Sequence, residues 1–197
     1  MAGRPREFDV IAAREVAMQL FWTQGYEATP LSELLPAMGL SKSSFYQTYE
    51  SKHVLFEQCL VRYGDILVNA MKEGLADAPC AIVFIRAALI QISNETSDPI
   101  GRRGCLMMNT ASEFSQRDQK FALIVRTGIQ AMAAVFTEAV VAAQAAGDIK
   151  TKARPEALAD YLVTAIIGLK TQVKAGASSK QIMSIAELTV TALEHMD

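Results

Sequence analysis

Apolar residues recur three or four positions apart along almost the whole chain, which is the spacing of one face of an α-helix. Between these stretches stand prolines, glycines and N-capping side chains, the residues that begin or end helices. No segment combines apolar–polar alternation with the turn residues of a hairpin. The pattern therefore predicts an all-α protein of about nine helices.

The same punctuation predicts where each helix lies. A first helix ends before Gly25, and Thr29 and Pro30 are expected as the N-cap and first residue of the next. Two short helices then span about 30–38 and 42–49, and Ser51 caps a long helix. Later helices are expected to begin near Pro79 (through Ile92), Cys105, Asp118 (to Gly147), Pro155 and Ser178 or Ser179, with a loop over 98–104.

Composition excludes several classes of protein. The 197 residues are 51% hydrophobic and 20% charged, which is enough apolar material for a core, and the formal net charge is −2. The N-terminus has no apolar stretch, and the apolar runs 139–147 and 162–169 are shorter than the roughly 20 residues that span a bilayer. We therefore expect a cytoplasmic protein with no membrane partner.

The cysteines and histidines argue against metal and His-based catalytic sites. The three cysteines are far apart with no CxxC pair, and the chain has only two histidines. Cys59 and Cys80 lie on apolar helix faces and are expected in the core. Glu113 and Glu138 are single carboxylates, and there is no glycine-rich phosphate loop or GxSxG sequence. We expect neither an enzyme nor a bound cofactor.

The segment from Thr29 to Lys52 carries the most functional information. Two short helices joined by a turn that contains Gly39 have the geometry of a helix-turn-helix. The second helix is expected to turn hydrogen-bonding side chains outward near its N-terminal end, where they suit base edges in the major groove of DNA. These candidate base contacts are Lys42, Ser43, Ser44 and Gln47.

Other residues are placed to reach phosphates on either side. Thr29, Tyr46, Tyr49 and Lys52 are the candidates, and Arg4 and Arg6 form an arm that suits the minor groove or phosphates. Each has a structural alternative: the serines as a helix cap, the tyrosines as packing, and the arm as an inert tail. A helical interaction module without DNA binding is the corresponding alternative for the whole chain.

Residues 14–56 resemble the DNA-binding head of the TetR family of repressors. The matching sequences are AMQLFWTQGYEAT and SELLPAMGLSKSSFYQTYESKHVLF, although Leu35 replaces a small residue and Pro36 falls inside the second helix. The resemblance implies a DNA-binding domain over 1–52 and a sensing and dimerisation domain over 53–197. It also implies a palindromic double-stranded operator, an unknown small-molecule inducer and a homodimer.

The last two helices are the expected dimer surface. They span about 155–175 and 179–196, and they carry more apolar residues than one core needs. One stripe on each helix should remain exposed and pair with a second copy. The apolar residues concerned are Leu158, Leu162, Ile166, Leu169, Ile182, Ile185, Leu188 and Leu193.

Two mechanisms of induction remain open. Cys105 follows Arg102 and Arg103 at a helix start, which favours a thiolate, and GCLMMNTASE resembles a subgroup that includes electrophile sensors, where Lys174 matches a lysine near the thiol. The alternatives are a buried, inert Cys105 and a pocket that binds the inducer. The candidate pocket residues, which also suit plain core packing, are Met107, Met108, Phe121, Met132, Phe136 and Tyr161.

Overall fold

The computed structural model describes residues 9–114 and 116–195. Within these ranges the chain forms α-helices and two 3₁₀ helices and no strand, which confirms the predicted all-α class. The 3₁₀ helices are η1 (Gln91–Ser97) and η2 (Gly101–Arg103). The α-helices are α1 (Val10–Gln24), α2 (Leu31–Ala37), α3 (Lys42–Tyr49), α4 (Lys52–Asp77), α5 (Ala81–Ile90), α6 (Leu106–Phe114), α7 (Gln119–Ala146), α8 (Pro155–Lys174) and α9 (Ser179–His195).

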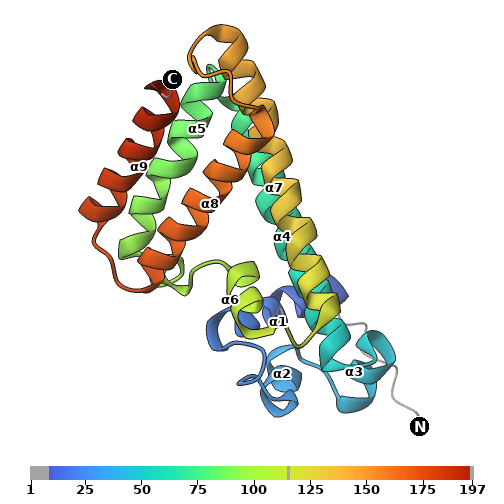
Figure 1. Ribbon diagram of the computed structural model, residues 1–197. Coiled ribbons are helices and arrows are strands. Elements are labelled where there is room, and N and C mark those ends of the chain that lie inside the picture. Colours follow the sequence, from blue (N-terminus) through green and yellow to red (C-terminus); the bar gives the residue numbers. More distant parts are fainter. Residues whose placement is uncertain (1–8, 115, 196–197) are drawn as a thin grey trace.

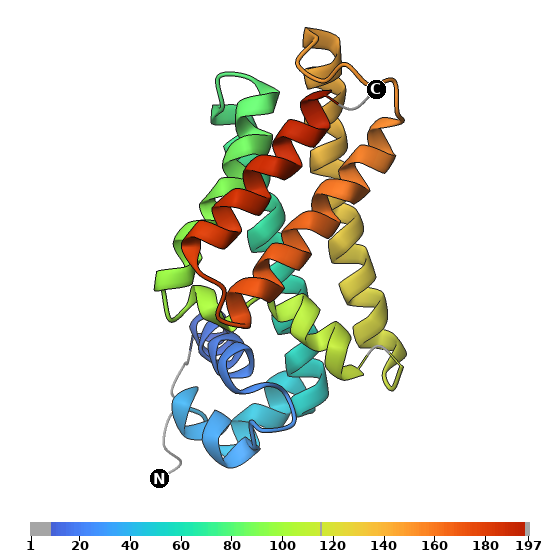
Figure 2. The ribbon, with the colours of Figure 1, turned by 60° about the vertical axis from the view of Figure 1, so that its left-hand side comes forward.

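The helices form a small head at one end of a longer body (Figure 1). The head consists of α1, α2, α3 and the first turns of α4. The two long helices, α4 and α7, run side by side away from the head (Figures 1 and 2). Helices α5 and α8 pack against α7, and α9 packs on α5 and α8. Because α4 begins in the head and ends far along the body, any change in its tilt moves the head.

Side-chain caps fix several helix starts where the sequence predicts them. The Ser41 hydroxyl accepts from the Ser44 N–H, and the Ser51 hydroxyl accepts from the Val54 N–H, each at 3.1 Å. Gly39 has φ +67° in the turn between α2 and α3, a conformation that glycine adopts without a Cβ clash. The helix-turn-helix is thus determined mainly by local sequence.

Three local expectations are wrong. Pro30, not Thr29, is the N-cap of α2, because the Thr29 hydroxyl donates instead to the Gly25 carbonyl at 2.6 Å. The helix expected to continue through Ile92 tightens into η1 after Ile90. Cys80, expected in the core, is exposed because it is the extended N-cap of α5 and lies before the buried face of that helix begins. Cys59 is buried, as expected.

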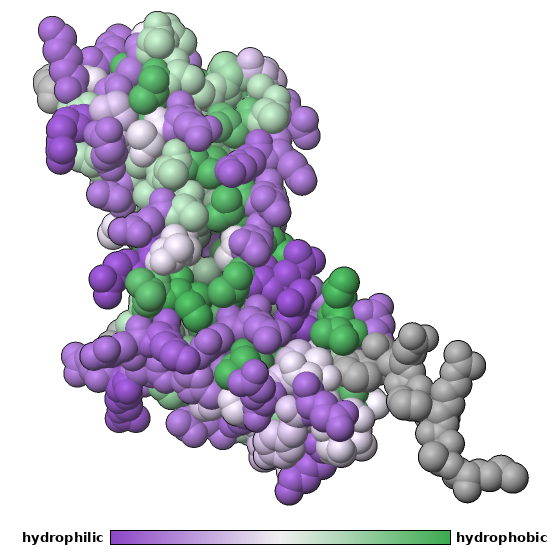
Figure 3. All heavy atoms as spheres, turned by 90° about the vertical axis from the view of Figure 1, so that its right-hand side faces the viewer, coloured by the Kyte–Doolittle hydropathy of each residue, from purple (hydrophilic) through white to green (hydrophobic). Residues whose placement is uncertain are grey.

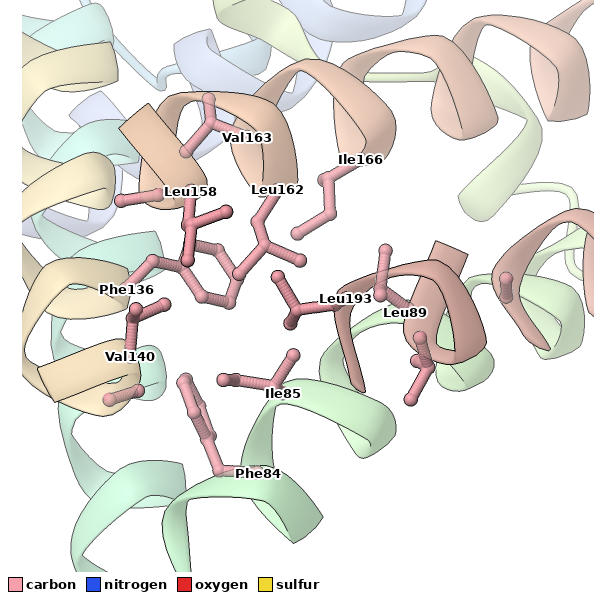
Figure 4. Packing of buried hydrophobic residues seen from close by; sticks show 14 of the residues in the cluster. Phe84, Ile85, Leu89, Phe136, Val140, Leu158, Leu162, Val163, Ile166 and Leu193 are labelled. Carbon is pink, nitrogen blue, oxygen red and sulfur yellow. The ribbon is translucent and has the colours of Figure 1, made fainter. Parts of the chain in front are cut away.

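The body has a core of its own, built between α5, α7, α8 and α9. Figure 4 shows Phe84, Ile85 and Phe136 facing Leu162 and Leu193 across this interior. All five side chains are buried. Each large aliphatic or aromatic side chain that leaves water here contributes about 1.5–3 kcal/mol, so this cluster holds the body helices in fixed positions.

A second buried cluster joins the head to the body. It extends from Phe21 of α1 and Phe45 of α3 through Phe56 of α4 to Leu106 of α6 and Phe121 of α7. The buried packing of the head therefore continues past residue 52, the boundary that the family resemblance implies. The head is attached through shared packing with α6 and the start of α7.

The long helix α7 is strongly apolar. By length and composition alone it could cross a membrane, although the shorter runs considered in the sequence could not. In the structure it packs against α4, α5, α6 and α8, and its Val135, Phe136 and Ala139 are fully or almost fully buried among them. Packing accounts for part of the apolar composition of α7, while Leu123 and Val141 of the same helix are exposed.

A polar contact ties the start of α4 to the start of α7. Asp118 caps α7 by accepting from the N–H groups of Lys120 and Phe121, and its other oxygen lies 2.5 Å from Nε2 of His53. The His53 ring stacks on Phe121 with 4.3 Å between centroids. Burial opposes ionisation of Asp118, but these hydrogen bonds outweigh it and hold the pKa of Asp118 below its ordinary value.

Replacing Asp118 should therefore destabilise the protein in a pH-dependent way. We expect Asp118→Ala to lower the free energy of unfolding at pH 7 by about 1–2 kcal/mol, measured by urea denaturation. A lowered pKa means that the contribution is complete above the ordinary aspartate value of about 3.9 and is lost as pH falls below it. The difference in free energy of unfolding between wild type and variant should become smaller in that pH range.

Asp9 offers a matched control, because its carboxylate caps α1 through the N–H groups of Ile11 and Ala12 but has no histidine partner in the described chain. Asp9→Ala should cost less than Asp118→Ala. Equal losses in the two variants, or a gap that stays constant from pH 7 to pH 3, would show that the His53 contact adds nothing.

Candidate DNA interface and effector cavity

One face of α3 is buried against the rest of the head. Phe45 and Tyr49 are both fully or almost fully buried, with ring centroids 5.6 Å apart. The Tyr49 hydroxyl donates to the Val10 carbonyl at the start of α1, at 3.1 Å. These contacts fix the rotation of α3 about its axis and so determine which side chains face outward.

The opposite face of α3 is exposed and polar. Lys42, Ser43, Tyr46 and Gln47 all lie on it, and Tyr46 is 44% exposed. The helix begins at Lys42, so all four side chains belong to its first six residues. The face carries hydrogen-bonding side chains of the kinds that contact bases and phosphates from a helix in a DNA major groove.

Three other candidate contacts are engaged inside the protein. Thr29 is completely buried and bonded to Gly25, and Tyr49 is buried as described above. The Ser44 hydroxyl is half-buried and lies 2.9 Å from the hydroxyl of Ser41. These positions hold the head together. Arg4 and Arg6 lie outside the described residues.

Lys52 is also partly engaged. Its ammonium lies 4.2 Å from the centroid of the Tyr26 ring, a cation–π distance. Burial lowers the pKa of Lys52, and the carboxylates of Glu27 and Glu113 oppose that shift. Lys52 is therefore a half-buried cation at the joint between α1, α4 and α6. Its predicted phosphate contact stays a prediction.

The body contains a cavity of about 510 Å³ between α4, α5, η1, α7 and α8. This volume is within the range of sites that bind small organic molecules. Its walls are mainly apolar, and polar groups stand at a few positions. The lining residues are Leu67, Ala70, Met71, Gly74, Asp77, Ala78, Val83, Phe84, Ala87, Ala88, Gln91, Ile92, Glu95, Met132, Phe136, Ile166 and Lys170.

An ion pair lies in the wall of this cavity. The Lys170 ammonium on α8 is 2.5 Å from the Glu95 carboxylate on η1, and both side chains are about three-quarters buried. A pair in this setting is shielded from water, so a ligand that competes with either partner changes the contact between α8 and η1. Lys170 follows Leu162 and Ile166 at four-residue spacing, and this spacing is the one feature of the sequence that places Lys170 on the inward face of α8.

Most of the predicted pocket residues lie elsewhere. Met132 and Phe136 do line the cavity. Phe121 is in the joint cluster, Met108 packs at its edge, and Tyr161 is exposed on α8. Helical periodicity places each residue on a helix face but does not determine which neighbouring helix that face contacts. For this reason the predicted pocket residues do not all line one cavity.

Met107 lines a second hollow, on the outer side of α4 and α7. Its thioether fills the space left by Gly64 and Gly128, where an added Cβ would lie 2.5 and 2.4 Å from the Met107 methyl carbon. The hollow of about 410 Å³ has Val61 and Leu123 at its edge. Figure 3, which faces this side of the body, shows apolar side chains gathered in patches among polar ones.

Cys105 is half-buried immediately before α6. It neighbours the buried Tyr63, whose pKa is raised first by burial and then by the adjacent Cys105 thiol. Lys174 approaches from α8: its side chain lies over Gly104, but its ammonium donates to the Asn109 side chain at 2.6 Å. The structure thus brings the Lys174 side chain close to the cysteine segment, with its ammonium bonded to Asn109.

The two arginines before Cys105 point to other partners. Arg102 donates to the Thr96 carbonyl at 2.7 Å, and Arg103 donates to Gln19 and Thr23 of α1. Both guanidinium groups are therefore occupied by partners other than the thiol. The sequence-based role for these arginines, activation of Cys105, finds no support in their contacts.

Comparison with known proteins identifies the family. Residues 14–59 match the sequence model described as bacterial regulatory proteins, tetR family, and residues 84–187 match the tetracyclin repressor-like C-terminal domain. The chain belongs to the TetR family of transcriptional regulators. The match to the head runs from within α1 to the first turns of α4, and the match to the body covers the cavity walls formed by η1, α7, α8 and most of α5, while the α4 wall lies outside it.

Individual relatives of this TetR family member agree. The transcriptional repressor ComR of Escherichia coli (strain K12) is 30% identical over 192 residues, which cover 95% of this chain and 90% of ComR. The repressor DhaR of Mycobacterium sp. (strain GP1) is 27% identical over 153 residues, 76% of this chain and 74% of DhaR. Both relatives are named as helix-turn-helix transcriptional repressors.

A solved structure shares the whole fold. It contains a cysteine mutant of the TetR family regulator CifR with a 26-base-pair operator duplex, and its CifR chain is 28% identical with a TM-score of 0.80. The match covers 96% of this chain and 99% of that one. The fold described above is therefore the fold of a regulator that has been observed on operator DNA.

Proposed function

We propose that this TetR family member is a repressor that binds a palindromic operator as a homodimer and releases it when a small molecule occupies the 510 Å³ cavity. The observation that carries the proposal is the exposed polar face of α3, held in position by the buried Phe45 and Tyr49. Such a protein acts on DNA in the bacterial cytoplasm.

The exposed face of α3 supplies the DNA contacts in this proposal. Ser43 and Gln47 are placed for base edges, Lys42 for a base or phosphate, and Tyr46 for a phosphate. The chain carries a net charge of −2, so bulk attraction to DNA is weak and positioned contacts have to supply the affinity. Two heads on one palindrome double the number of such contacts.

The surface of α8 and α9 supports a homodimer. Tyr161, Ile185 and Leu188 are exposed there, and Leu188 is 66% exposed. Space is open around Gly168 on α8, so another helix can approach closely at that point. The other predicted stripe residues are buried in the chain's own body: Leu158, Leu162, Ile166, Leu169, Ile182 and Leu193. The unpaired apolar stripe is thus narrower than the sequence implies, and it lies on both helices.

The ligand class follows from the cavity wall. Met71, Phe84 and Phe136 favour an apolar body, and the Glu95–Lys170 pair favours one polar or charged group on the ligand. Because α4 forms one wall and also begins in the head, a ligand that changes the position of α4 changes the spacing of the two α3 helices in a dimer. Loss of that spacing weakens both half-sites together.

Replacing Lys42 tests the assignment of α3. We expect Lys42→Ala to weaken binding to a duplex that wild-type protein has selected from random DNA. If Lys42 contacts a phosphate, the loss should be similar for all sequences, and the slope of log affinity against log salt should fall by about 1.

Lys72→Ala is the matched control, because Lys72 is an exposed lysine of α4 on the outer hollow, within the body. This variant should keep the wild-type affinity and salt slope. The assignment of α3 is wrong if the two variants bind the duplex equally well, provided that circular dichroism shows both to be folded.

A second mechanism of release, by modification of Cys105, also has specific support. The thiol is half-buried at the joint, beside Tyr63 and within the segment that Lys174 covers. The solved relative CifR was studied as a cysteine mutant on operator DNA, which supports attention to the cysteines. Covalent addition of an electrophile to the thiol would place new bulk between α4 and α6.

Cys105→Ser separates the two mechanisms. Iodoacetamide should release wild-type protein from the selected duplex if Cys105 is the sensor, and should leave Cys105→Ser bound. Cys80→Ser is the control, since Cys80 is exposed and distant in sequence from the joint. Equal release of wild type and Cys105→Ser, measured by gel shift, would exclude the cysteine mechanism and leave the cavity ligand.

A further inference from the structure

The arginine pair and Trp22, the single tryptophan of the sequence, are unused by the function proposed so far. The Trp22 indole N–H donates to the Gly104 carbonyl at 2.9 Å. The Arg103 guanidinium lies over the same indole, 4.5 Å from the ring. The segment before α6 is therefore fastened to α1 of the head by an unusually specific set of groups.

Arg103 adds two more bonds to the same helix. Its Nη1 donates to the Gln19 side chain at 2.9 Å and to the Thr23 hydroxyl at 3.0 Å. Gln19, Trp22 and Thr23 lie three and four residues apart, so they share one face of α1. This face of α1 is held by η2 and by the residue after it.

At its other end, η2 is fastened to η1. Arg102 donates to the Thr96 carbonyl at 2.7 Å. Gly101 lies so close to Glu95 that an added Cβ would be 2.6 Å from the Glu95 carbonyl oxygen and 2.8 Å from its Cα. Because no space separates the two backbones, a displacement of η1 at Glu95 has to move η2.

Glu95 links these contacts to the cavity, because its carboxylate pairs with Lys170 of α8 in the cavity wall. Tyr63 of α4 also contacts this series of residues. The buried Tyr63 ring packs edge-on against the Trp22 ring, with 5.1 Å between their centroids. A continuous series of direct contacts thus runs from the cavity through η1 and η2 to α1 of the head.

We infer that Trp22 and Arg103 are positioning residues, which set the orientation of the DNA-binding head according to the state of the Glu95–Lys170 pair in the cavity. This inference rests on the proposed function and names its regulation. A ligand group that competes for Glu95 or Lys170 shifts η1, η2 follows through Gly101, and the Trp22 contact on α1 loosens. The head then changes its tilt without any contact between ligand and head.

A double-mutant cycle tests the coupling. In wild-type background, Lys170→Met breaks the cavity pair and should weaken binding to the selected duplex about tenfold, within the range of known couplings. In a Trp22→Phe background, which keeps a ring but removes the N–H donor, the same change should cost less than about twofold. Arg86→Met, which breaks the Arg86–Glu194 pair between α5 and α9, is the control and should leave affinity unchanged.

Fluorescence of the single tryptophan gives a readout that needs no DNA. Lys170→Met should shift the Trp22 emission to the red, as Arg103→Gln should by direct removal of the guanidinium, and Arg86→Met should not. If Lys170→Met does not fold, Glu95→Gln breaks the same pair from the other side.

The outcomes separate this inference from the proposed function. Failure of wild type to select any duplex would count against the proposed function, and the emission of Lys170→Met would still decide the inference. Equal costs of Lys170→Met in the two backgrounds, or an emission in Lys170→Met identical to wild type, would overturn the inference.

Discussion

Aromatic packing at the joint between head and body fixes how the two parts of the molecule are oriented. Phe21 of α1 meets Phe56 of α4 at 4.8 Å, and Phe56 meets Phe121 of α7 at 5.0 Å. Tyr26 and Phe114 close the group from the turn after α1 and from the end of α6. Edge-on contacts of this kind have defined geometry, so the cluster fixes direction as well as distance. Helices α1, α4, α6 and α7 therefore meet at one aromatic cluster, and this cluster sets the orientation of the head relative to the body.

The parts of the molecule that local chemistry determines were predictable from the sequence. Gly39 and the caps Ser41 and Ser51 define α3 and its neighbours, and the predicted bounds of 42–49 agree with the structure. The exposed face of Lys42, Tyr46 and Gln47 followed, because helical periodicity places it opposite Phe45. The family resemblance covered the same segment, so the motif and the physical argument support one another.

Contacts between distant parts of the chain determine the features that the sequence did not predict. Thr29 and Tyr49 have the residue types of phosphate contacts, yet both hydroxyls are turned inward to backbone carbonyls. The cavity draws its walls from five separate elements, and its Glu95–Lys170 pair joins residues 75 positions apart. Arg103 stands two residues from Cys105 but contacts α1, 80 and 84 positions away. Adjacency in sequence suggested a thiol site there, whereas the fold uses the arginine to hold the head.

The central claim is that the cavity determines where the two heads of a dimer stand. The most direct test is the distance between spin labels on Glu33→Cys, an exposed position of α2, in a Cys80→Ser, Cys105→Ser background. It should be measured by pulsed electron resonance with and without the selected duplex. In wild type bound to the duplex, the two recognition helices should lie about one DNA turn, or a multiple of it, apart. Ala87→Phe fills the cavity from α5. We predict that in this variant, without DNA, the distance between the labels differs from the value measured for wild type on the duplex. Identical distance distributions for wild type and Ala87→Phe, together with equal binding of the duplex, would contradict the account.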